Sequence, residues 1–277
     1  MSRDVSFGQY YPAESFVHKL DPRTKLLMVI AYIVGVFLVK DLWGFIPVGM
    51  FLLAAILVSR VPLKSILKSL KAVLLIVILT AILNVLFYKE GQVLWSWWRI
   101  SITVEGLLTA LRLALRLVLL VLGTTLLTLT TTPMNLTDGM ESLMKPLKYI
   151  RVPVHDIALI MSIALRFIPI LMEEVDKIML AQKARGAAFD NGNIFKRAKA
   201  LLPILIPLFV SALRRAEELA LALDARCYNA TPNRTKMKRL RFGYRDLIAA
   251  LLTAVLIVLI VAVNFRFWGL FAPLGWL

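Results

Sequence analysis

The sequence predicts an all-α, polytopic membrane protein with about five transmembrane helices and long amphipathic cytoplasmic helices between the fourth and fifth spans. Of its 277 residues, 60% are hydrophobic and only 18% are charged, and the mean hydropathy is +0.78. These values are too apolar for an ordinary soluble domain. Several apolar runs are long enough to cross ~30 Å of hydrocarbon as helices. Helices are expected because the apolar-polar alternation of a membrane barrel is missing.

The N-terminal membrane region, residues 1–132, is predicted to contain the first four spans. Residues 1–24 are polar and carry no signal-peptide pattern, so the first span is expected to act as the insertion signal. The apolar runs 26–39 and 42–59 flank the pair Lys40-Asp41 and predict a helical hairpin. A short amphipathic stretch with four basic residues follows, which places the N-terminus in the cytoplasm. These basic residues are Arg60, Lys64, Lys68 and Lys71.

The third and fourth spans are predicted at residues 72–88 and 106–130. Between them, residues 89–105 hold three tryptophans, which favour the headgroup level of a membrane, and this segment is expected to be extracellular. The fourth span then returns the chain to the cytoplasm and ends before Pro133. The tryptophans are Trp95, Trp97 and Trp98.

Residues 133–243 are predicted to form a cytoplasmic and interfacial region. Two apolar stretches, 156–172 and 200–213, are short and interrupted, so we expect helices that lie against other helices at the membrane face. Each stretch passes into an amphipathic one, which predicts two long helices that leave the bilayer surface. The interrupting residues are Arg166, Pro169, Pro203 and Pro207.

The C-terminal region, residues 244–277, is predicted to hold the fifth span at 247–263. A basic tract over residues 234–241 precedes this span and favours a cytoplasmic start, so the C-terminus is expected outside the cell. Nineteen of the 33 lysines and arginines lie between Pro133 and Asp246, which also favours a cytoplasmic location for this part of the chain. The tract is interpreted as a topology signal and a contact with anionic lipid.

Composition argues against several functional classes. A single cysteine and two histidines leave little material for a disulfide, a zinc site or a redox site. No segment matches the glycine-rich phosphate-binding loop of an ATPase. The predicted spans hold almost no carboxylate or histidine for acid-base chemistry. We therefore expect no catalytic residue, no cofactor and no resident metal. The net charge of +16 is not accompanied by a nucleic-acid recognition fold, so no nucleic-acid partner is expected.

The two long helices of the cytoplasmic region end in similar sequences. The pattern Leu-Ala-x-x-Ala-Arg occurs at residues 180–185 and again at 221–226, forty-one residues later. An arginine between small residues at a helix end suits docking, because a partner can approach closely and the guanidinium can hold a carboxylate through two parallel hydrogen bonds. The alternative is that each arginine only complements the helix dipole, worth ~0.3–1 kcal/mol at a surface.

The chain resembles EcfT, the transmembrane T-component of energy-coupling factor transporters, a vitamin-importing branch of the ATP-binding-cassette transporters. The resemblance covers nearly the whole chain and includes the two Ala-Arg-Gly-type helix ends. Cys227 stands in the second end where the family has glycine. The other matching segments are Gly8-Gln9-Tyr10, Ser15, His18 to Lys25, Glu105-Gly106-Leu107 and Thr131-Thr132-Pro133.

The resemblance implies a non-catalytic scaffold with several partners. Membrane helices would hold one or more substrate-binding S-components, and two coupling helices would insert their ends into grooves of two ATPase subunits. ATP would be hydrolysed in those partner subunits. The residues implied in ATPase docking are Ala184, Arg185, Gly186, Ala225, Arg226 and Cys227. Cysteine in place of glycine would cost of order 1 kcal/mol if position 227 needs a positive φ.

Two further arginines and two alternatives remain open at this point. Arg112 and Arg116 lie on one face of the fourth span, at a cost of ~2.5–3.5 kcal/mol each in lipid. Arg112 is expected to reach outward, and Arg116 to have a partner within this chain or on an S-component.

A dedicated T-component of a cobalt or nickel importer is a close alternative, although the Gly8-Gln9-Tyr10 opening and six methionines within residues 134–179 favour the shared, multi-vitamin type. A stand-alone polytopic transporter or membrane enzyme is the alternative of another class.

Overall fold

The computed structural model describes residues 10–87, 93–97, 100–187, 194–228 and 240–271. These residues form two compact units, which we call the membrane unit and the coupling unit. The membrane unit extends to Val154 and resumes at Arg241, and the coupling unit comprises residues 155–240. The Gly8-Gln9 pair, Trp98, the basic positions 234–239 and the tail after residue 271 were considered in the sequence analysis and lie outside the described residues.

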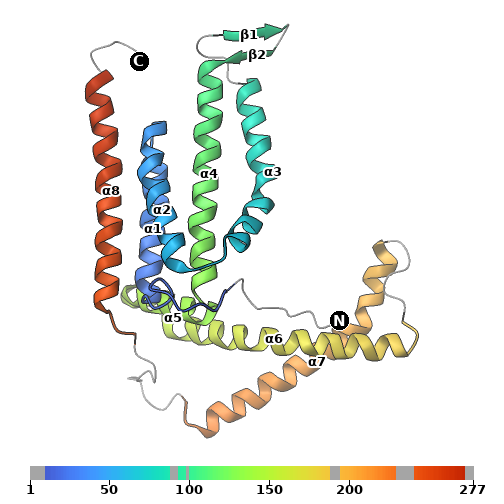
Figure 1. Ribbon diagram of the computed structural model, residues 1–277. Helices are drawn as coiled ribbons and strands as arrows, with labels where there is room; N and C mark the ends of the chain where they lie inside the picture. The colour runs from blue at the N-terminus through green and yellow to red at the C-terminus, as the bar shows by residue number, and fades with distance from the viewer. Residues whose placement is uncertain (1–9, 88–92, 98–99, 188–193, 229–239, 272–277) are drawn as a thin grey trace. The chain divides into compact units, whose positions relative to one another are not determined.

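The first half of the membrane unit consists of four upright helices and a hairpin (Figure 1). The helices are α1 (Pro22–Leu38), α2 (Phe45–Ser59), α3 (Leu63–Phe87) and α4 (Val104–Thr130), with the 3-10 turn η1 (Leu42–Gly44) between α1 and α2. α3 is bent by 51° between Leu63–Lys71 and Val73–Phe87. Strands β1 (Val93–Trp97) and β2 (Ile100–Thr103) pair antiparallel at the end of the bundle where α3 and α4 meet the hairpin.

The remaining elements of the membrane unit are α5 (Pro133–Leu143), the 3-10 turn η2 (Lys145–Ile150) and α8 (Tyr244–Phe271). α5 begins where the sequence predicts an exit from the fourth span, because the Thr132 side chain accepts a hydrogen bond from the Asn135 amide and Pro133 follows at the first helical position. α5 packs against α1. A Cβ on Gly139 would lie 3.0 Å from the Pro22 side chain and 3.2 Å from its backbone, closer than most Cβ contacts, so the approach of α5 to α1 favours glycine.

Helices α1 and α4 cap each other with buried or half-buried cations. Lys25, in the first turn of α1, donates from Nζ to the Thr130 carbonyl at the end of α4 (2.9 Å) and to the Thr131 hydroxyl (3.2 Å). Arg116 of α4 donates to the Val39 carbonyl just after α1 (2.6 Å). The last carbonyls of a helix have no intrahelical donor, and each cation satisfies one of them in the antiparallel neighbour.

A network of polar residues joins the start of α1 to the start of α8. Asp21 caps α1 by accepting from the Arg23 amide (2.9 Å), and its own amide donates to Asp246 Oδ1 (2.8 Å). The second oxygen of Asp246 accepts from the Gly243 amide (2.8 Å). Asp21 and Asp246 are both buried, and α1 and α8 pack along their lengths. The Asp246 carboxylate thus fixes the entry of α8 against the entry of α1, which the Asp21 carboxylate caps.

The segment before α1 is held by His18. Its Nε2 lies 3.1 Å from the Tyr11 carbonyl, which can only accept, so Nε2 carries the proton. In the neutral ring Nδ1 then accepts from the Ser15 hydroxyl (2.7 Å). Burial lowers the pKa of His18 below its ordinary value, which favours this neutral form. The motif from Ser15 to Lys25, noted above only for its resemblance, is therefore a structural connection among the segment before α1, α4 and α8.

The hydrophobic core of the membrane unit lies between α1, α2, α4 and α8. Tyr32 is at its centre, with its hydroxyl donating to the Leu119 carbonyl (2.9 Å) and its ring stacked on Phe51. A Cβ on Gly123 would overlap the Tyr32 ring, so glycine permits the close approach of α1 and α4. The buried members are Tyr32, Val36, Val39, Phe45, Val48, Leu52, Leu119, Leu256 and Ile260.

The coupling unit consists of α6 (Val154–Ala184) and α7 (Ile194–Ala225). With 31 and 32 residues, these helices are about 46 and 48 Å long at 1.5 Å per residue. Pro169 lies inside α6, and Pro203 and Pro207 lie inside α7, without ending either helix. The prediction of two long helices in this region is thus correct.

The all-α class is confirmed, with the β1–β2 hairpin as an unpredicted addition. Among the described residues, four helices are long and apolar enough to cross a membrane, or five if bent α3 counts as one span. This set differs in membership from the predicted five. It includes α6, whose apolar residues lie mainly before Glu173, and it omits α1, which has 17 residues and a length of about 26 Å. The compact units divide after Val154, with α5 in the membrane unit where it packs against α1, and the functional division predicted at Pro133 stays a prediction.

Candidate functional site

The end of α6 is a left-handed helix cap centred on Gly186. The Gly186 amide donates to the Lys183 carbonyl (3.0 Å), and the Ala187 amide donates to the Gln182 carbonyl (3.0 Å). Gly186 has a φ of +88°. This pair of bonds and the positive φ define the Schellman motif, in which the last carbonyls of the helix are satisfied by the turn that follows. Arg185 is the last residue before the turn.

The end of α7 has the same cap with cysteine in the glycine position. The Cys227 amide donates to the Asp224 carbonyl (2.9 Å), and the Tyr228 amide donates to the Leu223 carbonyl (3.0 Å). Cys227 has a φ of +50°, a left-handed conformation that costs a side-chain-bearing residue about 1–2 kcal/mol. Arg226 therefore occupies in α7 the position that Arg185 occupies in α6, and the positive φ considered for residue 227 is present.

All six predicted docking residues are exposed in the two caps. These are Ala184, Arg185, Gly186, Ala225, Arg226 and Cys227. No Cβ contact restricts the space around Gly186. An exposed guanidinium with small neighbours on a rigid cap presents five N–H donors to a planar acceptor such as a carboxylate. The structure thus shows two matching basic tips, and docking to an acidic groove remains our prediction for them.

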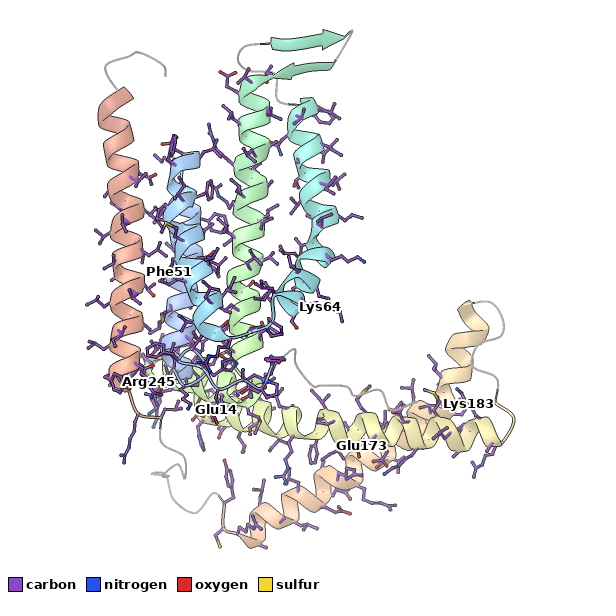
Figure 2. The ribbon with its side chains drawn as sticks, in the orientation of Figure 1. Glu14, Phe51, Lys64, Glu173, Lys183 and Arg245 are labelled. Atoms are coloured by element: carbon purple, nitrogen blue, oxygen red, sulfur yellow. The ribbon has the colours of Figure 1, made fainter. Side chains whose placement is uncertain are left out.

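The two coupling helices are joined where they cross, and the Tyr228 hydroxyl at the end of α7 also lies 3.4 Å from His155 Nε2 at the start of α6. Glu174 of α6 accepts from Ser211 (2.6 Å) and from the Arg215 guanidinium (2.7 Å), both on α7. Glu174 lies ten residues before Ala184, and Arg215 lies ten residues before Ala225. The separation of forty-one residues between the two tips is thus also the separation between Glu174 and Arg215. Each tip lies ~16 Å beyond the crossing along its helix. In Figure 2, Glu173 and Lys183 mark the part of α6 between the crossing and its tip.

α7 carries a row of exposed apolar side chains. Leu205 is 54% exposed, Phe209 is 66% exposed and Leu213 is 50% exposed, at intervals of four residues. Leu201, Leu202, Ile206 and Val210 are exposed beside them. Residues four apart share one face of a helix, so these side chains form a continuous apolar stripe. A stripe of this length marks a surface that another apolar surface covers.

Arg112 and Arg116 of α4 have different surroundings. The sequence analysis expected a partner for Arg116 either within this chain or on an S-component. In the structure the partner lies within this chain, because the Arg116 guanidinium donates to the Val39 carbonyl. The guanidinium also lies 5.9 Å from the centre of the Phe37 ring. Arg112 is half-buried, and its Nε has no hydrogen-bond partner among the described residues. Asn264 of α8 donates to the Leu38 carbonyl (2.7 Å) at the same α1 end. The Nε of Arg116 is likewise buried without a partner, so the two arginines differ in that only the Arg116 guanidinium makes a hydrogen bond among the described residues.

Several structural residues were missed from the sequence. Lys25 and Asp246 connect three helices, and Glu174 connects the coupling helices, but none of them was assigned a role. In the sequence each of them is a charged residue at the edge of an apolar run. Many exposed residues have the same position, so this pattern does not identify a structural role. Within the part of the chain that the structure describes, no group of three or more histidine, cysteine or acidic side chains is arranged to hold a metal ion.

Replacing Cys227 with glycine is expected to stabilise the α7 cap. The change removes a Cβ at positive φ and gains about 1 kcal/mol, which slows hydrogen exchange of the 227 and 228 amides ~5-fold. The mirror change, Gly186→Ala, is expected to speed exchange of the 186 and 187 amides by a similar factor. Cys227→Ala is the matched control, since it retains the Cβ. Equal slowing by Cys227→Ala and Cys227→Gly would show that φ is not the cause.

Comparison with known proteins gives consistent matches over nearly the full length. The model of the CbiQ family, described as cobalt transport protein, matches residues 13–237. The chain is 47% identical to the energy-coupling factor transporter transmembrane protein EcfT of Ruminiclostridium cellulolyticum, covering 97% of this chain and 100% of that protein. It is 48% identical to EcfT of Clostridium kluyveri and 44% identical to EcfT of Bacillus subtilis, in each case over 97% of this chain and 99% of the relative.

Proposed function

The chain belongs to the family of energy-coupling factor transporter transmembrane proteins, and from this membership we propose that it is a scaffold coupling ATP hydrolysis to vitamin uptake. It is a multi-pass membrane protein and a transporter component. In the proposal, two ATP-binding-cassette ATPase subunits hydrolyse ATP, and one or more membrane-embedded S-components bind the substrate. The observation that carries the proposal is the pair of matching arginine caps at the ends of α6 and α7.

The ATPase subunits are proposed to receive these caps in acidic grooves. Arg185 and Arg226 occupy equivalent cap positions, and each belongs to a helix more than 45 Å long by the usual rise. Two like tips on crossed helices fit two like partners, such as a pair of related ATPase subunits. A guanidinium is suited to such a groove because it binds carboxylates bidentately and stays charged when desolvated.

An S-component is proposed to cover the apolar stripe of α7. The stripe offers an extended nonpolar surface that the described part of this chain leaves exposed. Arg112 is proposed as a further contact, because its half-buried guanidinium has no hydrogen-bond or ionic partner among the described residues, whereas that of Arg116 is bonded to Val39. The N-terminus and the coupling unit are proposed to be cytoplasmic and the C-terminus extracellular, following the basic residues after α2 and before α8.

The Glu174–Arg215 pair is proposed to make the two coupling helices move as one body. Glu174→Arg in the chain assembled with its partners is expected to lower ATP-driven uptake several-fold while the ATPases stay bound, because the tips are unchanged but like charges meet at the crossing. Combining it with Arg215→Glu restores opposite charges and should recover most of the uptake. No recovery in the double variant would exclude the ion pair as the connection. Uptake per ATP hydrolysed, measured in proteoliposomes, is the readout.

A second candidate is a dedicated T-component of a cobalt or nickel importer, which the description of the matching family model favours. A stand-alone transporter or membrane enzyme is the remaining alternative. Affinity purification from native membranes separates these functions. The proposal expects two ATPases with several small membrane proteins. A single fixed membrane partner with Co²⁺- or Ni²⁺-dependent uptake would support the metal importer, and purification of the chain without partners would contradict both.

A further inference from the structure

Two cavities adjoin on the membrane unit near the end of α2. The first has a volume of about 540 Å³ and is lined by charged, polar and apolar side chains from the segment before α1, from the end of α2 and from the start of α8. The second, of about 480 Å³, is almost entirely apolar and lies between α1, α2, α4 and α8. Phe16 and Val58 line both cavities, so the two adjoin at these residues.

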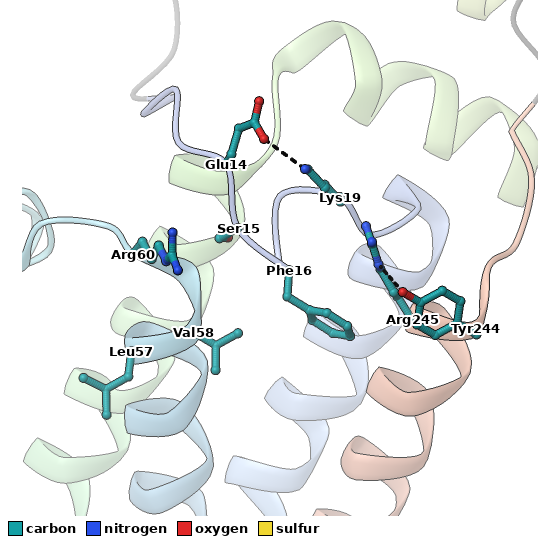
Figure 3. Close-up of a pocket in the computed structure, with 9 residues that line it drawn as sticks. All are labelled: Glu14, Ser15, Phe16, Lys19, Leu57, Val58, Arg60, Tyr244 and Arg245. Atoms are coloured by element: carbon teal, nitrogen blue, oxygen red, sulfur yellow. Dashed lines mark hydrogen bonds and ion pairs between the residues drawn. The ribbon is translucent and has the colours of Figure 1, made fainter.

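The first cavity has an excess of positive charge (Figure 3). Three cations, Lys19, Arg60 and Arg245, line it together with one carboxylate, Glu14. Lys19 is paired with Glu14 at 3.0 Å, which leaves the two arginines without a carboxylate partner in the cavity. Arg245 donates to the Tyr244 hydroxyl (3.2 Å), and the Arg60 side chain has no hydrogen-bond or ionic partner among the described residues. Two such guanidinium groups suit an anion with several oxygens, such as a phosphate ester.

Arg60 is held in place by an unusual backbone conformation. It caps α2 with a φ of +55°, and its amide donates to the Leu57 carbonyl. The preceding Ser59 is fully buried and donates to the Ile56 carbonyl (2.7 Å). The left-handed cap therefore fixes the backbone of Arg60, whose side chain lines the first cavity.

The second cavity opens on the outer surface of the helix bundle. Met50 of α2 and Leu252 of α8 line it, and their side chains are 70% and 51% exposed. Its floor includes Tyr32 of α1 and Gly123 of α4. An apolar slot that opens between two spans faces the hydrocarbon of the bilayer and is accessible to lipid tails without passing through water.

We propose that the two cavities form one site for an anionic phospholipid, whose phosphate lies between Arg60 and Arg245 and one of whose acyl chains enters the apolar slot. The two arginines favour an anionic lipid over a zwitterionic one. The apolar slot favours a lipid with an acyl chain over a free phosphate ion. Basic pockets next to spans on the cytoplasmic side bind anionic headgroups. A lipid bound here touches α1, α2, α4 and α8, so it adds to the connection between α1 and α8 that the Asp246 carboxylate makes.

The test is native mass spectrometry of the delipidated full-length chain with added phosphatidylglycerol or phosphatidylcholine. We expect one phosphatidylglycerol to bind at least ~10-fold more tightly than phosphatidylcholine, and Arg60→Gln with Arg245→Gln to remove this preference. Arg151→Gln is the matched control, because Arg151 is also an exposed arginine with a positive φ at a helical end but lines neither cavity. Equal affinities for the two lipids, or an unchanged preference in the double variant, would overturn the proposal.

A second pair of experiments tests the acyl chain. Ala55→Phe fills the slot, and it should weaken phosphatidylglycerol binding about as much as the arginine changes do. Because this position is half-buried, Val58→Glu at the exposed junction of the cavities provides an independent variant that repels the phosphate. If Ala55→Phe binds the lipid normally while inorganic phosphate displaces it, the polar cavity is a free phosphate site and the lipid proposal is wrong.

Discussion

Charge reversal at both helix caps, Arg185→Glu with Arg226→Glu, is expected to release the ATPases from the membrane chain. Replacing a guanidinium that binds a carboxylate leaves the partner charge desolvated and unpaired, at a cost of about 2–5 kcal/mol per site. Two reversals far apart along the sequence act on separate contacts and add. Retention of the ATPases on the purified chain should fall below about a tenth of wild type, and single variants should give intermediate values.

This prediction has a control on the same helix. Arg214→Glu makes the same charge change at an exposed position of α7, twelve residues before Arg226, and it should leave the ATPases bound. All variants should insert in the membrane normally, because the caps lie outside the membrane unit. Full co-purification of both ATPases with the double variant would show that the arginines act only on the helix dipoles.

Replacement of Lys25 by methionine is expected to give the largest loss of stability in the membrane unit. Lys25 is 5% exposed, and its ammonium binds the Thr130 carbonyl, the Thr131 hydroxyl and, at 3.4 Å, the His18 carbonyl. Methionine fits the apolar part of the site but leaves these acceptors unsatisfied, at about 1–3 kcal/mol each before relaxation. A total of ~2–4 kcal/mol lowers the midpoint of thermal unfolding by roughly 5–10 °C.

The measurement is the midpoint of heat-induced loss of the monodisperse peak in size-exclusion chromatography. Lys64→Met is the matched control, because Lys64 is exposed near the start of α3 and should show no shift. Asp246 interacts electrostatically with Lys25, so Lys25→Met with Asp246→Asn should cost less than the sum of the single changes. Strict additivity, or a shift no larger than that of Lys64→Met, would contradict the buried network.

The spans were predictable because their signal is local. Hydropathy identified the runs of α2, α4 and α8, since ~20 apolar residues have few stable alternatives to a transmembrane helix. Thr132 and Pro133 also predicted the end of α4 correctly. The β1–β2 hairpin was missed because its tryptophans were interpreted as a membrane-interface signal, which does not specify the backbone conformation.

The partners of charged residues were not predictable because they come from distant parts of the chain. Lys25 meets Thr130 across 105 residues, and Asp21 meets Asp246 across 225 residues. For Arg116 the depth in the span indicated a partner, and the structure identified it as the end of α1. The repeat of the two arginine tips was visible in the sequence. That Glu174 and Arg215, at the same spacing of forty-one residues, form an ion pair between the helices is shown only by the structure.

Cys227 shows what sequence and structure contribute to one residue. The sequence indicated that cysteine stands where the family has glycine, and that this replacement costs of order 1 kcal/mol if residue 227 has a positive φ. In the structure Cys227 does have a positive φ, and both hydrogen bonds of the cap are formed. The second tip is therefore built like the first, with a stored strain of about 1 kcal/mol that glycine would remove.

The most direct test of the coupling role is ATP-driven vitamin uptake in proteoliposomes. The chain assembled with its ATPases and an S-component should support uptake that requires ATP. The same assembly carrying Arg185→Glu with Arg226→Glu should retain S-component binding but give no ATP-dependent uptake, and the chain alone should transport nothing. Uptake by the chain alone, or undiminished ATP-driven uptake with both arginines reversed, would contradict the scaffold function proposed for this protein.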